Sequence, residues 1–430
     1  MVTARGSHDA AARTYVLDVE QVLPSASGSR RKPPLHIPFA VGLVGPDGAD
    51  MPLRLAGEPA AGATTRILEL RSTTERFEFV DVAQAPVPSL LRGFSAPVQV
   101  VFDYRDEELA LLASHDCDAV NRWDAAQRLF ANAILELAQA HRNRAPLVLP
   151  ELLARIVAVL LDDDTSDPAL RALALALPDP AYIANLEPTP GPDGIVAAWT
   201  FVETSLAKRH RAAFERAYAR HRTRAPYAPT PDQAGVRSLS NRCLRYLCAL
   251  DDEAAHAMAS KQYRRADNMT DAIGALAALR DSTSGARSEL YSQFEAKWRD
   301  EPLVLDKWFA LQAKSMRTDA LETVRALVAH PRFNARNPNR VRSLVGAFAL
   351  GNFGRFHAAD GSGYAFTADQ VLALDGANPQ LASMLAGAFS LWRRFAEPRR
   401  DRMQRSLERI ARAPSLSPDV REIVTRTLAS

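Results

Sequence analysis

Three blocks of sequence decide the fold: VLDKWFALQA (304–313), NPNRVRSLVGAF (337–348) and FHAADGSGYAF (356–366). The first block repeats its bulky residues at the spacing of an α-helix, at Leu305, Trp308, Phe309 and Gln312. The third holds the polar, glycine-bearing loop Asp360-Gly361-Ser362-Gly363 between His357 and Tyr364. Together the blocks predict two helices and a loop in an all-helical domain.

The middle block has the signals of a helix start. Asn337 is a suitable N-cap, and Pro338 follows at the first helical position, where its missing N–H costs nothing. A core stripe within about 60° of the helix wheel follows, made of Val341, Leu344, Val345 and Phe348. Arg340 and Arg342 fall on opposite flanks of this stripe, where each can reach what the helix packs against.

Before residue 106 the apolar residues alternate with a period of two, which indicates strands. We expect residues 1–12 to be disordered because they are small and polar. Strands are predicted from Tyr15 onward and at 35–43, 51–55, 66–71, 76–82 and 97–104. Short strands punctuated by Pro and Gly predict an immunoglobulin-like β-sandwich over residues 13–105.

After Asp106 the period changes to 3.6 and predicts a large all-α domain over residues 106–430. Several helices begin with a capping residue, at Asp118, Asp167, Asn378 and Ser417. Asp319 with Glu322 is a variant of the capping box. We expect roughly a dozen helices, with longer breaks at 178–194 and 224–232, in a superhelical, solenoid-like stack. The predicted fold class is multidomain, a sandwich followed by this helical domain.

Composition excludes several classes of protein. A net charge of +3 on 430 residues gives no reason to expect a nucleic-acid or membrane partner. Three cysteines are too few for a disulfide framework, so a cytoplasmic location is expected. We expect the polar run after Met1 to be an artificial start in a linker.

Longer words of the sequence carry more specific information. They are PLHIPFAV (34–41), PVPSLLRGFSAPV (86–98), NRWDAAQ (121–127), SKQYRRADNMTDAIGAL (260–276) and NPQLAS (378–383). In this order, and with the three blocks above, the chain resembles the bacterial aminopeptidase N family, zinc exopeptidases of the gluzincin class. The resemblance covers nearly the whole chain, and it implies a β-sandwich followed by a helical domain.

The catalytic signature of that family, His-Glu-x-x-His, is absent from this sequence. No two of the nine histidines are four residues apart, and none is followed by Glu. The resemblance therefore implies the C-terminal, non-catalytic region of a zinc aminopeptidase, with zinc in the parent enzyme and no cofactor in this chain. The chain should be inactive alone. Its implied partners are its own missing N-terminal and catalytic domains and peptide substrates, and a monomer is expected.

The resemblance also implies which residues face the substrate chamber. They are Arg342 and Gln380, with Arg340 as a further candidate, because guanidinium and amide groups bind peptide carbonyls or a C-terminal carboxylate. The alternative is that each makes a polar contact between helices. Related enzymes can place an arginine four residues after the glutamine, where this chain has Met384.

Other clusters favour structural roles. His115 to Asp118 are consecutive, so a helix-start loop is favoured over a zinc site. Asp162 to Asp167 lack the glycine of a calcium loop. The arginine stripe formed by Arg402, Arg405, Arg409 and Arg412 has no interleaved aromatics and predicts a solvated face rather than nucleic-acid binding. The alternative function for the whole chain is a free-standing helical-repeat scaffold that binds a protein or peptide in its concavity.

Overall fold

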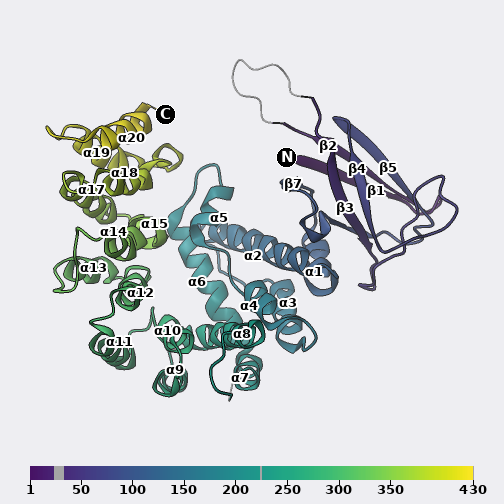
Figure 1. The fold of residues 1–430 in the computed structure, drawn as a ribbon. Coiled ribbons are helices and arrows are strands. Elements are labelled where there is room, and N and C mark those ends of the chain that lie inside the picture. Colours follow the sequence, from purple (N-terminus) through teal and green to yellow (C-terminus); the bar gives the residue numbers. More distant parts are fainter. Residues whose placement is uncertain (24–32, 223–224, 430) are drawn as a thin grey trace. The chain divides into compact units, whose positions relative to one another are not determined.

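The computed structural model describes residues 1–23, 33–222 and 225–429 and joins strands to a long series of helices (Figure 1). The chain folds into two compact units. The first holds Met1–Asn132 with Pro150–Leu177, and the second holds Ala133–Leu149 with Pro178–Ser430. The predicted boundary between residues 105 and 106 stays a prediction, since the first unit contains helices as well as strands.

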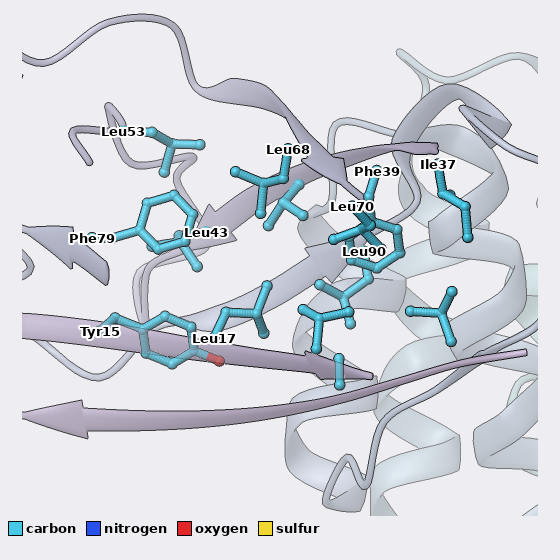
Figure 2. Packing of buried hydrophobic residues seen from close by; sticks show 14 of the residues in the cluster. Tyr15, Leu17, Ile37, Phe39, Leu43, Leu53, Leu68, Leu70, Phe79 and Leu90 are labelled. Atoms are coloured by element: carbon cyan, nitrogen blue, oxygen red, sulfur yellow. The ribbon is translucent and has the colours of Figure 1, made fainter. Parts of the chain in front are cut away.

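The strands of the first unit form two sheets. They are β1 (Val2–Asp9), β2 (Thr14–Gln21), β3 (Ile37–Val44), β4 (Thr65–Leu70), β5 (Thr74–Val80), β6 (Val87–Leu90) and β7 (Val100–Val101). One sheet has the order β5-β2-β1-β7 and the other the order β4-β3-β6. Figure 2 shows side chains from both sheets meeting in a common core that includes Leu17, Phe39 and Leu43, none of which is exposed. The predicted sandwich is confirmed.

The expectation of a disordered start at residues 1–12 is wrong. Residues 2–9 form β1, which pairs antiparallel with β2 from Val2↔Gln21 to Asp9↔Thr14 and parallel with β7. Val2 and Ala4 face the core on alternate positions of the strand. The hydrogen bonds that order β1 come from β2 and β7, so the polarity of the segment itself did not reveal the strand.

Two other strand predictions are also corrected. The predicted strand at 51–55 is reduced to isolated bridges, one at Asp50 just before it (Val44↔Asp50) and one at its last residue (Leu55↔Phe79). Pro52 cannot donate to a ladder, although Leu53 still fills the core. The strand predicted at 97–104 shortens to β7, whereas β6 was not predicted because its four residues are all buried and show no alternation.

Helices complete the first unit. They are α1 (Asp106–His115), the beginning of α2 (Ala119–Arg142), α3 (Glu151–Asp162) and α4 (Pro168–Ala174). The predicted N-caps are confirmed, because Asp118 Oδ1 accepts from the N–H groups of Val120 and Asn121, and Asp167 caps α4. Buried Arg92 joins strands to helices in this unit, since its Nη2 lies 2.7 Å from Asp50 Oδ1 and 3.1 Å from Asp116 Oδ1.

The second unit is helical apart from its turns. After the end of α2 come α5 (Pro180–Leu186), α6 (Pro192–Arg209), α7 (Arg211–Arg220), α8 (Pro231–Cys248), α9 (Glu253–Arg265), α10 (Met269–Ala278), α11 (Gly285–Trp298), α12 (Pro302–Ala313) and α13 (Ala320–Val328). Then follow α14 (Pro338–Val341), η2 (Arg342–Gly346), α15 (Ala347–Gly351), α16 (Phe353–Phe356), α17 (Ser362–Asp375), α18 (Pro379–Ala386), η3 (Gly387–Phe389), η4 (Trp392–Arg394), α19 (Arg399–Ala411) and α20 (Pro418–Ala429). Successive helices pack on one another, α7 on α8, α11 on α12 and α17 on α18, as in a helical repeat.

The helix signals of the sequence are mostly confirmed in this unit. Asn378 caps α18, and Ser417 Oγ accepts from Val420 N–H at the start of α20. The capping box at Asp319 is wrong, because that carboxylate pairs with Arg317 Nη2 at 2.7 Å and makes no cap bond. The break expected at 178–194 contains α5. Residue 224 of the other expected break, 224–232, lies outside the described residues. The described residues hold more helices than the dozen expected, since short elements such as α14 to α16 divide longer patterns.

Among the described residues, no helix is both long enough and apolar enough to cross a bilayer.

Candidate functional site

The segment from Asn337 to Gly351 holds two of the three predicted site residues. Asn337 accepts hydrogen bonds from Asn339 N–H and Arg340 N–H, and Pro338 opens the helix, as the sequence predicts. The predicted stripe of Val341, Leu344, Val345 and Phe348 is completely buried. Residues 342–346 form a π-helical turn between α14 and α15. Such turns are rare and are often found at functional sites.

Arg340 is turned into the packing of the helices. Its side chain is buried over the ring of Phe309, at 4.8 Å from the centroid, and its Nη2 donates to Pro302 O at 3.2 Å. Its Nε lies 2.8 Å from Asp306 Oδ1, within ion-pair distance although the N–H is not aligned for a hydrogen bond. Burial lowers the pKa of Arg340, against the opposing effect of Asp306. A role for Arg340 in lining the substrate chamber stays a prediction, and the burial of its side chain argues against it.

Arg342 lies on the other flank and is exposed. Among the described residues, no side chain or backbone group makes a hydrogen bond or ion pair with its guanidinium. Its backbone is held firmly, because it lies directly between the capped start of α14 and the buried Leu344. Arg342 thus has a fixed Cα and a head group that is available to a ligand.

Gln380 lies in the first turn of α18 and is also exposed. Its backbone oxygen accepts from Ser383 Oγ, whereas its side-chain amide has no hydrogen-bond partner in the part of the chain that the structure describes. Met384 is half-buried four residues later, so it shares the face of α18 that bears Gln380.

Gly346 brings these two helices together. A Cβ placed on Gly346 would lie 3.8 Å from Arg342 Cβ and 3.7 Å from Met384 Cε. Arg342 and Met384 therefore flank the same glycine, and Gln380 lies one turn from Met384. Neither the role of Gly346 nor this meeting of helices was predicted. A glycine inside an apolar helical stripe is the one signal that could have suggested a close approach.

The two exposed residues offer two kinds of hydrogen-bonding group, the guanidinium of Arg342 and the primary amide of Gln380. The first is permanently charged and can bind a carboxylate with two parallel hydrogen bonds. The second can donate to and accept from a peptide unit. This face, made of Arg342, Gly346, Gln380 and Met384, is called the Arg342 face below.

The clusters with metal-binding residue types have structural roles. In the loop before α2, Asp116 pairs with Arg92, and Asp118 caps the helix. In the acidic loop after α3, Asp163 pairs with Arg122 at 3.1 Å and accepts from Ser166 N–H. Within the described ranges, no three His, Cys, Asp or Glu side chains are grouped so that they could hold a metal ion.

Asp251, His256 and Ser282 have the residue types of a catalytic triad but not its geometry. Ser282 Oγ lies 3.2 Å and Asp251 Oδ1 2.8 Å from the same atom, His256 Nε2. A triad instead uses both ring nitrogens, one toward the nucleophile and the other toward the acid. Burial acts to raise the pKa of Asp251, but hydrogen bonds from Ser282 and His256 outweigh it and lower the pKa. The cluster joins two loops.

The arginine stripe on α19 lies on the solvent side of its helix. Arg405, Arg409 and Arg412 are exposed, and Met403, Leu407 and Ile410 on the opposite side are completely buried. Arg409 pairs with Asp369 and Arg412 with Glu408, which reduces the local positive charge. This placement agrees with a solvated face.

Two family profiles match the chain. One, described as "Domain of unknown function (DUF3458_C) ARM repeats", matches residues 106–429, and the other, described as "Domain of unknown function (DUF3458) Ig-like fold", matches residues 1–103. The chain belongs to the DUF3458 family. The two descriptions agree with the sandwich and with the helical repeat-like packing described above.

The DUF3458 chain is similar to aminopeptidase N from several bacteria. It is 36% identical to that of Escherichia coli (strain K12) over 433 residues, which cover 100% of this chain and 49% of the relative. The match to that of Haemophilus influenzae is 35% identical over 423 residues, 98% of this chain and 48% of the relative. The chain therefore spans about half the length of these curated relatives. The resemblance to aminopeptidase N is confirmed, and the coverage is consistent with a C-terminal region.

A solved structure is also similar over the whole DUF3458 chain. It is the crystal structure of Legionella pneumophila aminopeptidase A in complex with aspartic acid, with a TM-score of 0.83 and 26% identity. The match covers 100% of this chain and 48% of that chain.

Proposed function

We propose that this chain is the C-terminal, non-catalytic part of a zinc aminopeptidase that removes N-terminal residues from peptides. Support comes from identity to aminopeptidase N along all of this chain and about half of each relative. The sequence has no His-Glu-x-x-His, so the zinc ligands would lie in the missing catalytic domain. Zinc bound there would supply an activated water for attack on the peptide bond.

The helical part would close over the active site and line the chamber that holds the peptide. The observation that carries this proposal is the contrast within one helix, where Arg340 is buried on an ion pair and Arg342 is exposed without a partner. Together with Gln380, Arg342 would bind the carbonyls or the C-terminal carboxylate of the substrate.

The proposed setting of the enzyme is the cytoplasm, and the proposed state is a monomer. Cys117, Cys243 and Cys248 form no disulfide bond with one another, which suits a reducing compartment. Partners would be the missing N-terminal and catalytic domains and peptide substrates, with no nucleic acid and no membrane.

Hydrolysis of an aminoacyl-arylamide by the isolated chain and by the intact enzyme tests this proposal. The isolated chain should show no turnover with or without added zinc, whereas the intact enzyme should be active and sensitive to chelators. Turnover by the isolated chain that is lost on mutation of its own histidines would overturn the non-catalytic assignment. An intact protein without peptidase activity that binds a partner through the Arg342 face would instead support the alternative of a helical-repeat scaffold.

A further inference from the structure

A cavity of about 210 Å³ opens inside the second unit. Its wall comes from α5, from α15 and α16 with His357 directly after them, and from the segment that runs from Gly387 to Phe395. Most of the lining is apolar and includes Ala184, Ala349, Leu350, Phe353 and Leu391. A cavity of about 150 Å³ with such a lining accepts a benzene ring. The space therefore suits an apolar group of single-ring size.

His357 is the most deeply buried polar group of this wall, with 7% of its surface exposed. Its ring packs against Phe353, Phe356 and Phe395. Burial, assisted by the charge of Arg399, lowers the pKa of His357 to about 3, so the ring is neutral at physiological pH.

The proton of this neutral ring lies on the nitrogen that is left for a ligand. Tyr364 is completely buried, and its hydroxyl lies 2.8 Å from His357 Nδ1. A buried phenol O–H needs an acceptor, and Nδ1 is its partner among the described residues, so the hydroxyl donates to Nδ1. The ring then has its N–H at Nε2, which has no hydrogen-bond partner in the described part of the chain.

Arg394 brings a positive charge to the same wall. Its Nη1 donates to Asn185 Oδ1 at 3.1 Å, and its Nη2 donates to carbonyl groups of Ala184, Asn185 and Glu187. Across residues 1–23, 33–222 and 225–429, no carboxylate pairs with this guanidinium, and Nε keeps a free N–H. No Asp or Glu belongs to the described lining of the cavity. His357 and Arg394 therefore supply N–H donors and a positive charge to the wall.

We propose that this cavity binds a small monocarboxylate with an apolar body of single-ring size. The ring would occupy the apolar space, and the carboxylate would accept hydrogen bonds from His357 Nε2 and from Arg394. The same chemistry could be presented by a free acid or by the C-terminal residue of a peptide. The site does not depend on the proposed peptidase function.

Gly387 provides a variant that fills the cavity without strain. It lies on the wall, its φ is −59°, and a Cβ added there would meet no atom within 4 Å. Gly376 is the matched control, because its φ is −68°, its added Cβ also meets nothing within 4 Å, and it does not line the cavity. Gly387→Leu should fold normally and occlude the site. Gly376→Leu should also fold normally and should leave ligand binding unchanged.

Calorimetric titration of the full chain with 3-phenylpropionate tests the proposal. The acid should bind the parent chain and the Gly376→Leu variant equally, and Gly387→Leu should weaken binding by about 10-fold or more. Replacing the carboxylate by its neutral amide, or changing Arg394→Met, should weaken binding by about 10- to 100-fold, as expected for a charge-assisted hydrogen bond.

Two further titrations distinguish the source of the ligand. Tighter binding of the tripeptide Ala-Ala-Phe than of 3-phenylpropionate, lost when its C-terminus is amidated, would assign the site to peptide C-termini. Tighter binding of the free acid would assign it to small acids. The proposal is overturned if neither 3-phenylpropionate nor Ala-Ala-Phe binds, if 3-phenylpropionate and its amide bind equally, or if Gly387→Leu leaves binding unchanged.

Discussion

The two flanks of the segment 338–351 show how one short helix can serve packing on one side and binding on the other. Arg340 and Arg342 differ by two positions, which separates their side chains by roughly 200° on a helix. Arg340 is buried on Phe309 with Asp306 beside it, whereas Arg342 is exposed beside Gly346. The two arginines are therefore in opposite environments. The buried one is not available to a ligand, and the exposed one is.

The comparison predicts that Arg340→Ala has the largest effect on stability. The substitution removes the cationic partner of Asp306, whose side chain is only 15% exposed, and leaves that carboxylate with the hydroxyl of Ser343 as its hydrogen-bond donor among the described side chains. Loss of one member of a buried pair costs about 3–5 kcal/mol, and the misaligned N–H favours the lower end. Urea unfolding followed by tryptophan fluorescence, to which Trp308 beside Phe309 contributes, measures this change.

Two controls make that experiment specific. Arg342→Ala should change stability by no more than about 0.5 kcal/mol, because an exposed side chain without a partner is removed. The double change Arg340→Met with Asp306→Leu should recover most of the lost stability, since the unpaired charge is removed as well. A stable Arg340→Ala variant would show that the ion pair is not structural and would return Arg340 to the chamber candidates.

Arg342→Ala in the intact enzyme should have the next largest effect, this time on substrate binding. If the guanidinium binds peptide, KM for tri- and tetrapeptides should rise by about 10- to 100-fold, the worth of a charged hydrogen bond. The ratio kcat/KM for a small aminoacyl-arylamide, which does not reach this face, should be nearly unchanged. Arg342→Lys keeps the charge without the planar guanidinium. Its KM for these peptides should lie between the values of the parent enzyme and of Arg342→Ala.

The experiment can also show that Arg342 has a structural role. Equal losses on peptides and on the arylamide, together with a lowered melting temperature, would assign Arg342 to bracing the helices.

The parts of this molecule that could be predicted from sequence are those fixed by local interactions. The cap at Asn337, the proline after it and the buried stripe of 338–351 depend on residues within a few turns, and all were confirmed. Strand β1 was missed because its order comes from pairing with β2, the strand that follows it in a hairpin, and with β7, which is far away in sequence. The capping prediction at Asp319 was wrong because its carboxylate pairs with Arg317 and does not cap the helix.

The candidate sites were predictable only as separate residues. Arg342 and Gln380 were identified through a resemblance, but the approach of Arg342 and Met384 to Gly346 emerges only from the packing of two helices. His357 was seen beside a polar loop, whereas its cavity is built from segments as distant as α5 and Gly387–Phe395. Periodicity identifies the face that a helix buries, and it does not identify which other helix will meet that face.

The smallest predicted effect concerns Met384. Met384 is half-buried, is four residues from Gln380 and places its Cε beside Gly346, so Met384→Arg would add a second guanidinium to the Arg342 face. Exposed charge pairs contribute only about 0.2–1 kcal/mol, so KM for a tripeptide with a free C-terminus should fall by about 1.5- to 5-fold. The amidated tripeptide and Met384→Gln should show no gain, because neither brings a cation and a carboxylate together. An equal gain for the free and the amidated peptide would mean that this face contacts the peptide through its carbonyls, and carboxylate recognition would then have to be assigned to other residues.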